Sequence, residues 1–277
     1  MYIEKKKIGK NSYLYLKESK RREGRVQTKT VAYLGRAPMS QEKIKEKIKE
    51  IKTNLNKQFF TEKQLNTLKN IKKDFNKKLR QPDKILVDDM FKDFKTYYIY
   101  NTNAIEGNTI SLKETNLLLN ENKAPSGKDL REIHDHINEK EAFDYLLKNK
   151  PEINSDLIID LHKNLLKNID ERVGTFRKHN VRVFGASLKT TDAQYILVDI
   201  KILLNWYNKN KKNLHPLILS ALFHEKFERI HPFYDGNGRT GRMLANLILI
   251  KKGFPPLIIK NRTRKNICTQ SRRMEHN

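Results

Sequence analysis

The 277-residue sequence contains one cysteine, one tryptophan and only 8 prolines. The single cysteine, Cys268, excludes a disulfide bond within the chain. A membrane helix needs roughly 20 consecutive apolar residues, and the most apolar run, Met243–Ile250, is far shorter. The first residues also lack the apolar segment of a secretory signal. We therefore expect a cytoplasmic protein that has no membrane contact.

The sequence has a large excess of positive charge. It contains 57 lysine and arginine residues against 32 aspartate and glutamate residues, a formal net charge of +25. Such a surface attracts polyanions, including nucleic acid, nucleotides and acidic protein faces, without choosing among them. The hydrophobic share of 37% is enough for a packed core, and the few glycines and prolines favour helices. We expect a mainly α fold.

Residues 1–36 have a different pattern from the rest of the chain. Apolar and polar residues alternate over residues 12–16 and 26–31, and glycines at positions 9, 24 and 35 separate the runs. This pattern predicts a small three-stranded antiparallel sheet.

The same segment is strongly basic. It carries eleven lysine and arginine residues against three glutamates, a net charge of +8, with four interleaved tyrosines, Tyr2, Tyr13, Tyr15 and Tyr33. Basic residues beside aromatic residues can bind nucleic acid. Alternatively, the lysines are the solvated face of the sheet and the tyrosines pack it. The segment resembles a basic module found at the front of some transposases.

Helical spacing dominates from residue 37 onward. Ile44, Ile48 and Ile51 share one helical face, and capping boxes begin at Thr61 and Ser111. We expect a helical arm at residues 37–83, a helical domain at residues 84–256 and a short basic tail at residues 257–277.

One interruption of the helices runs from Gly174 to Tyr195. Residues 181–183 and 195–197 have strand-like composition and flank a polar stretch. We expect a β-hairpin flap here, with helices resuming at Ile200.

The segment from His231 to Arg242 combines residues that suit phosphate chemistry. A glycine-rich turn before a helix leaves free backbone amides that bind phosphate. Arg239 and Arg242 lie three residues apart and can both reach phosphate oxygens. Asp235 supplies the hard oxygen that Mg²⁺ prefers, and His231 can accept a proton at neutral pH. Taken one by one, the same residues could be a helix cap, an ordinary turn and a solvated face.

The whole run resembles the signature of the Fic family (filamentation induced by cAMP), His-Pro-Phe-x-Asp/Glu-Gly-Asn-Gly/Lys-Arg-x-x-Arg, and meets every specified position. The resemblance implies a helical core from about Leu86 to Pro256. It also implies transfer of AMP from ATP to a serine, threonine or tyrosine hydroxyl of a target protein, with release of pyrophosphate. In that reaction His231 takes the hydroxyl proton and Asp235 holds Mg²⁺ or Mn²⁺. The phosphates would be bound by Gly236, Asn237, Gly238, Arg239, Gly241 and Arg242.

An upstream segment resembles the inhibitory motif of the same family, Ser/Thr-x-x-x-Glu-Gly/Asn. It is met by Thr102, Glu106 and Gly107, in a helix expected at about residues 96–108. A carboxylate paired with Arg242 would occupy the guanidinium that should hold the γ-phosphate. Alternatively, Glu106 is a plain helix-end residue followed by a glycine that terminates the helix.

The predicted flap resembles the hairpin on which this family docks the target backbone as an added strand. The docking residues would be Val181, Arg182, Val183 and Phe184. The same residues could instead form an edge hairpin that only covers the core.

Several alternatives stay open from the sequence. The protein could be a nucleic-acid-binding regulator whose Fic core is inactive or secondary, or an interaction scaffold that Glu106 keeps closed. It could also use another nucleotide donor or remove AMP, because residues 257–277 are shorter than the segment with which many relatives shape the adenine pocket. Self-modification and a homodimer are also open.

Overall fold

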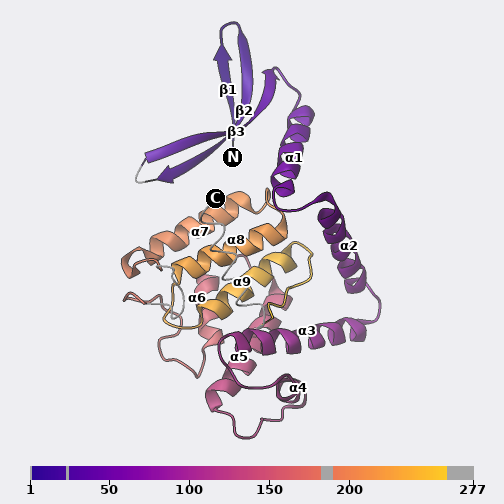
Figure 1. Cartoon of the computed structure of the whole chain (residues 1–277), viewed down its shortest axis with the longest axis vertical. Helices are drawn as coiled ribbons and strands as arrows, with labels where there is room; N and C mark the ends of the chain where they lie inside the picture. Colours follow the sequence, from indigo (N-terminus) through magenta and orange to yellow (C-terminus); the bar gives the residue numbers. More distant parts are fainter. Residues whose placement is uncertain (1, 23–24, 182–189, 261–277) are drawn as a thin grey trace. The chain divides into compact units, whose positions relative to one another are not determined.

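The computed structural model describes residues 2–22, 25–181 and 190–260 (Figure 1). The chain divides into two compact units. Unit 1 runs to Thr67 and includes Lys209–His215, and unit 2 comprises Leu68–Asn208 and the residues from Pro216 onward. Helices dominate the described residues, which confirms the predicted mainly α fold. The four segments predicted from the sequence stay a prediction.

Unit 1 contains the small sheet, and its three antiparallel strands confirm the prediction for residues 1–36. Leu14, Leu16 and Leu34 are buried on one face, where Ile44 and Ile48 of α1 pack against them. The neighbouring order is β1-β2-β3. The elements are β1 (Tyr2–Ile8), β2 (Asn11–Arg22), β3 (Arg25–Ala37) and α1 (Gln41–Lys57).

Unit 2 is built around its last helix. Apolar residues lie on most sides of α9, so the helix is buried nearly all round, and it packs against α3, α5, α6 and α8. The remaining helices are α2 (Glu62–Leu79), α3 (Lys84–Ile105), α4 (Leu112–Glu121), α5 (Leu130–Asn149), α6 (Ser155–Leu165), α7 (Ile196–Asn210), α8 (Pro216–Ile230) and α9 (Asn237–Lys251).

The predicted helix starts are confirmed by their caps. Thr61 and Gln64 exchange the two hydrogen bonds of a capping box at the start of α2. Ser111 and Glu114 do the same at α4, with the Ser111 N–H donating to Glu114 Oε2 at 2.7 Å. Each cap satisfies backbone amides that have no partner within the helix.

The strand predicted at residues 195–197 is wrong. A short 3-10 turn, Ala193–Tyr195, leads directly into α7 at Ile196. Ile196, Ile200 and Leu203 are buried at helical spacing, whereas Val198 is 52% exposed. The local run of β-branched and aromatic residues suggested a strand, but burial of one helical face decides the structure.

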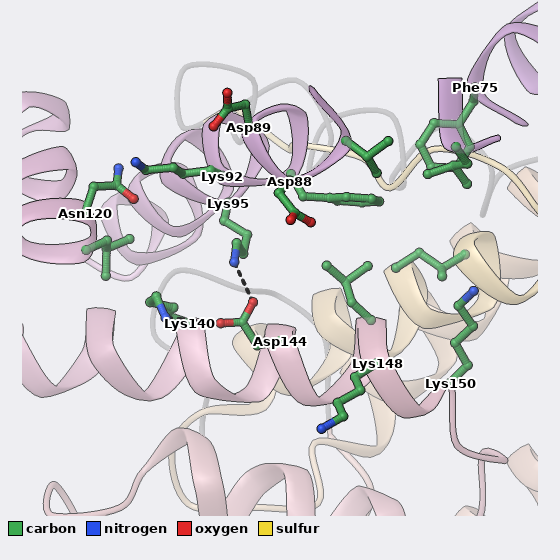
Figure 2. A pocket seen from close by; sticks show the side chains of 16 residues that line it. Phe75, Asp88, Asp89, Lys92, Lys95, Asn120, Lys140, Asp144, Lys148 and Lys150 are labelled. Atoms are coloured by element: carbon green, nitrogen blue, oxygen red, sulfur yellow. Dashed lines mark hydrogen bonds and ion pairs between the residues drawn. The ribbon is translucent and has the colours of Figure 1, made fainter. Parts of the chain in front are cut away.

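No helix among the described residues is long and apolar enough to cross a membrane. A cavity of about 620 Å³ lies within unit 2 and is lined by α2, α3, α4, α5 and the C-terminal end of α9 (Figure 2). An ion pair between Lys95 Nζ and Asp144 Oδ1, 2.6 Å long, is part of its lining. None of the residues from His231 to Arg242 lines this cavity.

Candidate active site

The loop between α8 and α9 closes on itself. The Asn237 side chain accepts a hydrogen bond from the Phe233 N–H and donates one to the Phe233 carbonyl, each at 2.9 Å. Gly236, with a φ of +71°, directly precedes α9, a backbone conformation that favours glycine. We predicted that Asn237 would steady a phosphate. Both polar groups of its side chain are instead engaged within the loop.

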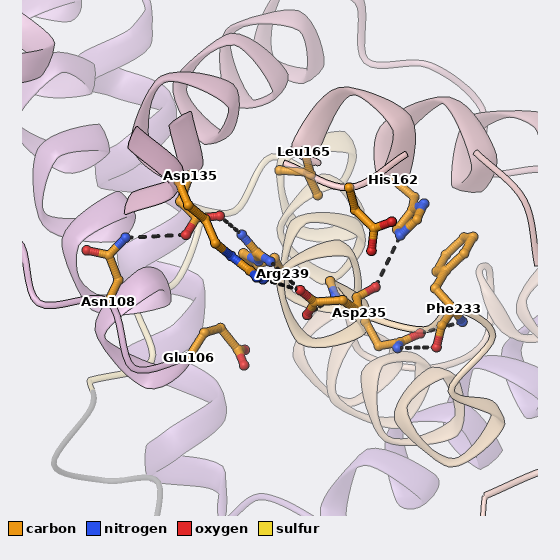
Figure 3. A network of polar contacts seen from close by, with 12 residues as sticks. Glu106, Asn108, Asp135, His162, Leu165, Phe233, Asp235 and Arg239 are labelled. Atoms are coloured by element: carbon orange, nitrogen blue, oxygen red, sulfur yellow. Dashed lines mark hydrogen bonds and ion pairs between the residues drawn. The ribbon is translucent and has the colours of Figure 1, made fainter. Parts of the chain in front are cut away.

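His162 of α6 packs against the loop and forms a hydrogen bond with it. Its ring stacks on Phe233 with the ring centres 3.6 Å apart. Nδ1 accepts a hydrogen bond from the Gly174 N–H at 3.2 Å, so Nε2 carries the proton that is donated to the Asp235 carbonyl at 3.1 Å (Figure 3). Burial lowers the pKa of His162 to about 4, so the ring stays neutral near neutral pH. Sequence patterns did not identify this residue.

The predicted base, His231, lies where α8 ends. Its side chain is 17% exposed, and its Nδ1 lies 4.0 Å from Glu228 Oε2. Burial is the main cause that lowers its pKa, the bond with the Glu228 backbone opposes the shift, and the positive charge of Arg177 adds to it. The imidazole is therefore mostly neutral at neutral pH, the form that can accept a proton.

The two arginines of the loop have different surroundings. Arg239 is almost fully buried and pairs with Asp135 of α5, and its Nη2 lies 3.7 Å from Asp235 Oδ2 (Figure 3). Asp235 also pairs with the exposed Arg131 at 2.6 Å. The guanidinium of Arg239, which we predicted to hold outer phosphates, is thus already engaged. Sequence patterns did not identify Asp135, because no motif marks it on α5.

Arg242, one turn further along α9, contacts the end of α3. Its Nε donates to Thr102 Oγ1 at 2.7 Å, and its Nη2 donates to Glu106 Oε1, also at 2.7 Å. Gly107, with a φ of +95°, directly follows Glu106 and lets the chain leave the helix. The structure therefore brings the three predicted inhibitory residues and Arg242 together.

The other two predicted glycines are in close packing. A side chain at Gly238 would collide with the Glu106 carboxylate, so this glycine lets Glu106 approach α9. A Cβ at Gly241 would come within 2.8 Å of Glu228 and 3.0 Å of His224 on α8. Gly241, predicted among the phosphate-binding residues, thus lies at the close contact between α8 and α9.

Comparison with known proteins agrees with this geometry. Residues 152–249 match the Fic/DOC family model. This stretch is a Fic domain. The Fic domain ends within α9 and includes the whole loop, whereas Glu106 lies outside the matched residues.

Curated relatives of the chain include adenylyltransferases. Protein adenylyltransferase fic-1 of Caenorhabditis elegans is 34% identical over 181 residues, which cover 63% of this chain and 35% of that protein. Protein adenylyltransferase Fic of Drosophila ananassae is 36% identical over 172 residues, 60% of this chain and 34% of that protein. The chain therefore spans about a third of the length of the curated relatives it matches.

Solved structures share the fold. A Fic domain containing signaling protein from Bacteroides thetaiotaomicron has a TM-score of 0.66 at 25% identity, covering 72% of this chain and 78% of that one. Fic-1 from Caenorhabditis elegans has a TM-score of 0.64 at 28% identity, covering 83% and 68%. Separately, residues 3–63 match the N-terminal domain of IS1634 family transposases.

Asp235 is the predicted metal ligand of the Fic domain. Its side chain is 40% exposed beside the start of α9. No group of three or more histidine, cysteine, aspartate or glutamate residues in the described ranges could hold a metal ion by itself. The carboxylate of Asp235 is already paired with the exposed Arg131, so Mg²⁺ would have to replace that exposed contact. One carboxylate together with substrate phosphates is a common way to hold Mg²⁺.

The predicted docking flap falls mostly outside the described residues. Arg182, Val183 and Phe184 belong to that part, and target docking by them stays a prediction. Val181 is described, and its carbonyl accepts a hydrogen bond from Thr190 Oγ1 at 3.2 Å. Residues 174–181 and 190–192 contain no strand.

Proposed function

We propose that the Fic domain transfers AMP from ATP to a serine, threonine or tyrosine hydroxyl of a protein. The observation that carries the proposal is the placement of the imidazole of His231, 17% exposed and held in its neutral form by burial, in the loop that leads into the N-terminus of α9. The unpaired amides at a helix start attract phosphate. The names of the relatives that are 34% and 36% identical support AMP as the transferred group.

The chemistry follows from these positions. His231 removes the proton of the attacking hydroxyl, whose oxygen forms a bond with the α-phosphorus of ATP. The bond from that phosphorus to the β-bridging oxygen breaks, and pyrophosphate leaves with the bonding electrons. Mg²⁺ held by Asp235 would neutralise phosphate charge when bound. Such transfers depend mainly on positioning and charge neutralisation, which these residues supply.

Glu106 restrains this reaction in our proposal. Its carboxylate is hydrogen-bonded to Arg242 and lies against Gly238, so it occupies space at the start of α9 where phosphates would bind. ATP must displace it or bind in an unproductive position. A charge-assisted pair of this kind is strong enough to compete with a ligand.

Transfer of label from α-labelled ATP tests the function. The Glu106→Gly chain, alone and mixed with a cell lysate, should acquire a label that mass spectrometry identifies as AMP on a hydroxyl side chain. His231→Ala in the same background should lose the label, because removing a general base costs about 10² to 10⁴ in rate. His134→Ala, a partly exposed histidine on α5, is the matched control.

Two results would count against the proposal. Label that persists in His231→Ala would show that His231 is not the general base. Equal or better labelling from another nucleoside triphosphate, or loss of AMP from a modified protein, would replace AMP transfer with one of the alternative reactions of this site.

A second function, nucleic-acid binding, is proposed for unit 1. Tyr13, Tyr15 and Tyr33 alternate with the buried leucines and therefore lie on the sheet face that α1 does not cover. Their ring centres are 5.4 Å apart for Tyr15–Tyr33 and 6.2 Å for Tyr13–Tyr33. Arg36 is paired with Tyr13 across the strands. Aromatic rings beside cations suit stacked bases and phosphates, and the match to a transposase domain supports this assignment.

Fluorescence anisotropy with single-stranded and duplex oligonucleotides tests this second function. Binding should weaken steeply with salt, and Tyr33→Ala should reduce single-strand affinity about tenfold, the order of one stacked base. Tyr145→Ala, an exposed tyrosine of α5, should have no effect. Salt-independent binding, or none at low salt, would leave the sheet without this role.

A further inference from the structure

Arg177 is a charged side chain in an unusual place. It is only 2% exposed, one of the largest fully buried side chains of the described residues. Within the same ranges no carboxylate forms an ion pair with it, and burial lowers the pKa of its guanidinium. The charge of Asp192 acts on Arg177 without an ion-pair contact, so hydrogen bonds must compensate most of the cost of burial, and the partners of Arg177 indicate its role.

Those partners are backbone carbonyls from two other parts of the site. The shortest bonds run from Nε to the His231 carbonyl, 2.7 Å, and from Nη2 to the Thr191 carbonyl, 2.5 Å. The Arg177 N–H also donates to the Pro232 carbonyl at 2.9 Å. The remaining acceptors are the carbonyls of His179 at 2.8 Å and Ile230 at 3.4 Å.

His231 needs such support because its backbone is strained. Its φ is +50°, in the left-handed region that a non-glycine residue rarely adopts. Its N–H still donates to the Phe227 carbonyl as in a helix, so the change of direction occurs at His231 itself. Strained backbone at a functional site persists only when the surrounding structure holds it. The His231 carbonyl, which follows the strained torsion, is the group that Arg177 holds.

We propose that Arg177 is a positioning residue for His231. Its guanidinium fixes the carbonyls on both sides of the strained residue and thereby aims the imidazole at the phosphate-binding loop. The catalytic consequence of this orientation rests on the proposed function. The contact between Arg177 and His231 can be tested separately.

The charge of Arg177 has a second consequence for His231. The groups that influence the imidazole are Glu228 of α8, Glu106 at the end of α3, Asp235 of the loop and Arg177 itself. Burial is the main cause of the lowered pKa of His231, Arg177 lowers it further, and Glu106 and Asp235 raise it. Removing the guanidinium should therefore raise the pKa of His231, whereas Arg177→Lys, which keeps the positive charge, should leave that pKa near its value in the parent.

Two substitutions separate geometry from charge. Arg177→Lys keeps the positive charge and loses the planar set of donors, whereas Arg177→Met loses both. Each is made in the Glu106→Gly chain, with Arg80→Met on an exposed arginine as the control. The measurements are kcat and KM for ATP, the ¹³C-histidine NMR titration of His231, assigned by its loss in His231→Ala, and thermal unfolding.

We expect Arg177→Lys to lower kcat about 10- to 100-fold while KM for ATP changes less than about twofold, because orientation and not binding is lost. The pKa of His231 should stay near that of the parent. Arg177→Met should lose kcat to the same extent and raise the pKa of His231. Should Arg177→Met fail to fold, Arg177→Lys decides the question.

The proposal is overturned if Arg177→Lys keeps the parental kcat. It is also overturned if a folded Arg177→Met titrates His231 as the parent does. If the parent transfers no AMP, the proposed function fails, while the His231 chemical shift in Arg177→Lys and the titration of His231 in Arg177→Met still report whether Arg177 holds this residue. An unchanged His231 signal in that case overturns the proposal as well.

Discussion

Two segments meet at the site of the Fic domain, and they are held in different ways. The loop before α9 is closed by its own residues, since Asn237 bonds Phe233 in both directions. The segment at residues 174–181 is held by remote groups: Gly174 bonds His162, Lys178 bonds the Tyr234 hydroxyl at 3.0 Å, and Arg177 bonds the loop. The turn from Phe233 to Asn237 in the first segment is therefore closed by local contacts, whereas the second segment depends on what surrounds it.

The largest expected effect concerns Ile196 at the start of α7, where burial and not the local strand-like pattern decides the structure. Ile196→Asp should destabilise the protein by about 4 kcal/mol, because an unpaired carboxylate would replace a side chain that is 1% exposed. Val198→Asp, two residues on and 52% exposed, should cost less than about 0.5 kcal/mol. Urea unfolding measures both. Equal losses would place both side chains on one buried face, as in an extended strand and not as in a helix.

Asn237 tests whether the loop is closed locally. Asn237→Ala leaves a buried N–H and a buried carbonyl of Phe233 without partners and should cost about 3 kcal/mol, with loss of AMP transfer. Asn180→Ala, in the externally held segment, removes the exposed acceptor of the Ala193 N–H and should cost about 0.5 kcal/mol. Denaturant titration compares the pair, and similar costs would remove the difference between the segments.

The buried carboxyl group of Glu139 makes a pH dependence of stability testable. Glu139 of α5 is fully buried, and burial raises its pKa to about 7 from an ordinary value of 4.5, although Arg239 and Arg242 oppose the shift. A raised pKa stabilises the fold below pH 4.5, and this contribution is lost as the pH rises through 7. Relative to Glu139→Gln, the parent should lose about 3 kcal/mol between pH 4.5 and 8.

Unfolding free energies of both chains across this range give the measurement. Glu141→Gln, an exposed change on the same helix, should leave the curve of the parent unaltered. A pH-independent difference between the parent and Glu139→Gln would mean that folding leaves the pKa of Glu139 unchanged.

The smallest expected effect is that of replacing Glu106, which contacts the start of α9 from α3. Glu106→Gly should raise auto-modification about tenfold, about 1.4 kcal/mol of barrier, because Arg242 becomes available to phosphate. Glu121→Gly, on an exposed glutamate of α4, is the control. Equal rates in the variant and the parent would discard the inhibitory role.

Patterns in the sequence predicted the features that are set by residues close together in the chain. The capping box of Ser111 and Glu114 joins residues three apart, and the turn at Gly236 needs only a glycine at a positive φ. The pairing of Glu106 with Arg242, 136 residues apart, was predicted only through the resemblance to a family motif. Asp135, His162 and Arg177 carried no such signal, because their roles depend on which helices meet.

The sequence by itself determined the three-stranded sheet through its alternation of apolar and polar residues. It determined the helix starts at Thr61 and Ser111 and the glycine-cornered turn through torsions and hydrogen bonds within a few residues. The tertiary structure alone decided that Ile196 begins a helix, that Arg239 is buried against Asp135 and that Arg177 holds His231. Those outcomes depend on long side chains and apolar faces finding partners far along the chain, and the free energy of such contacts exists only after the helices have packed.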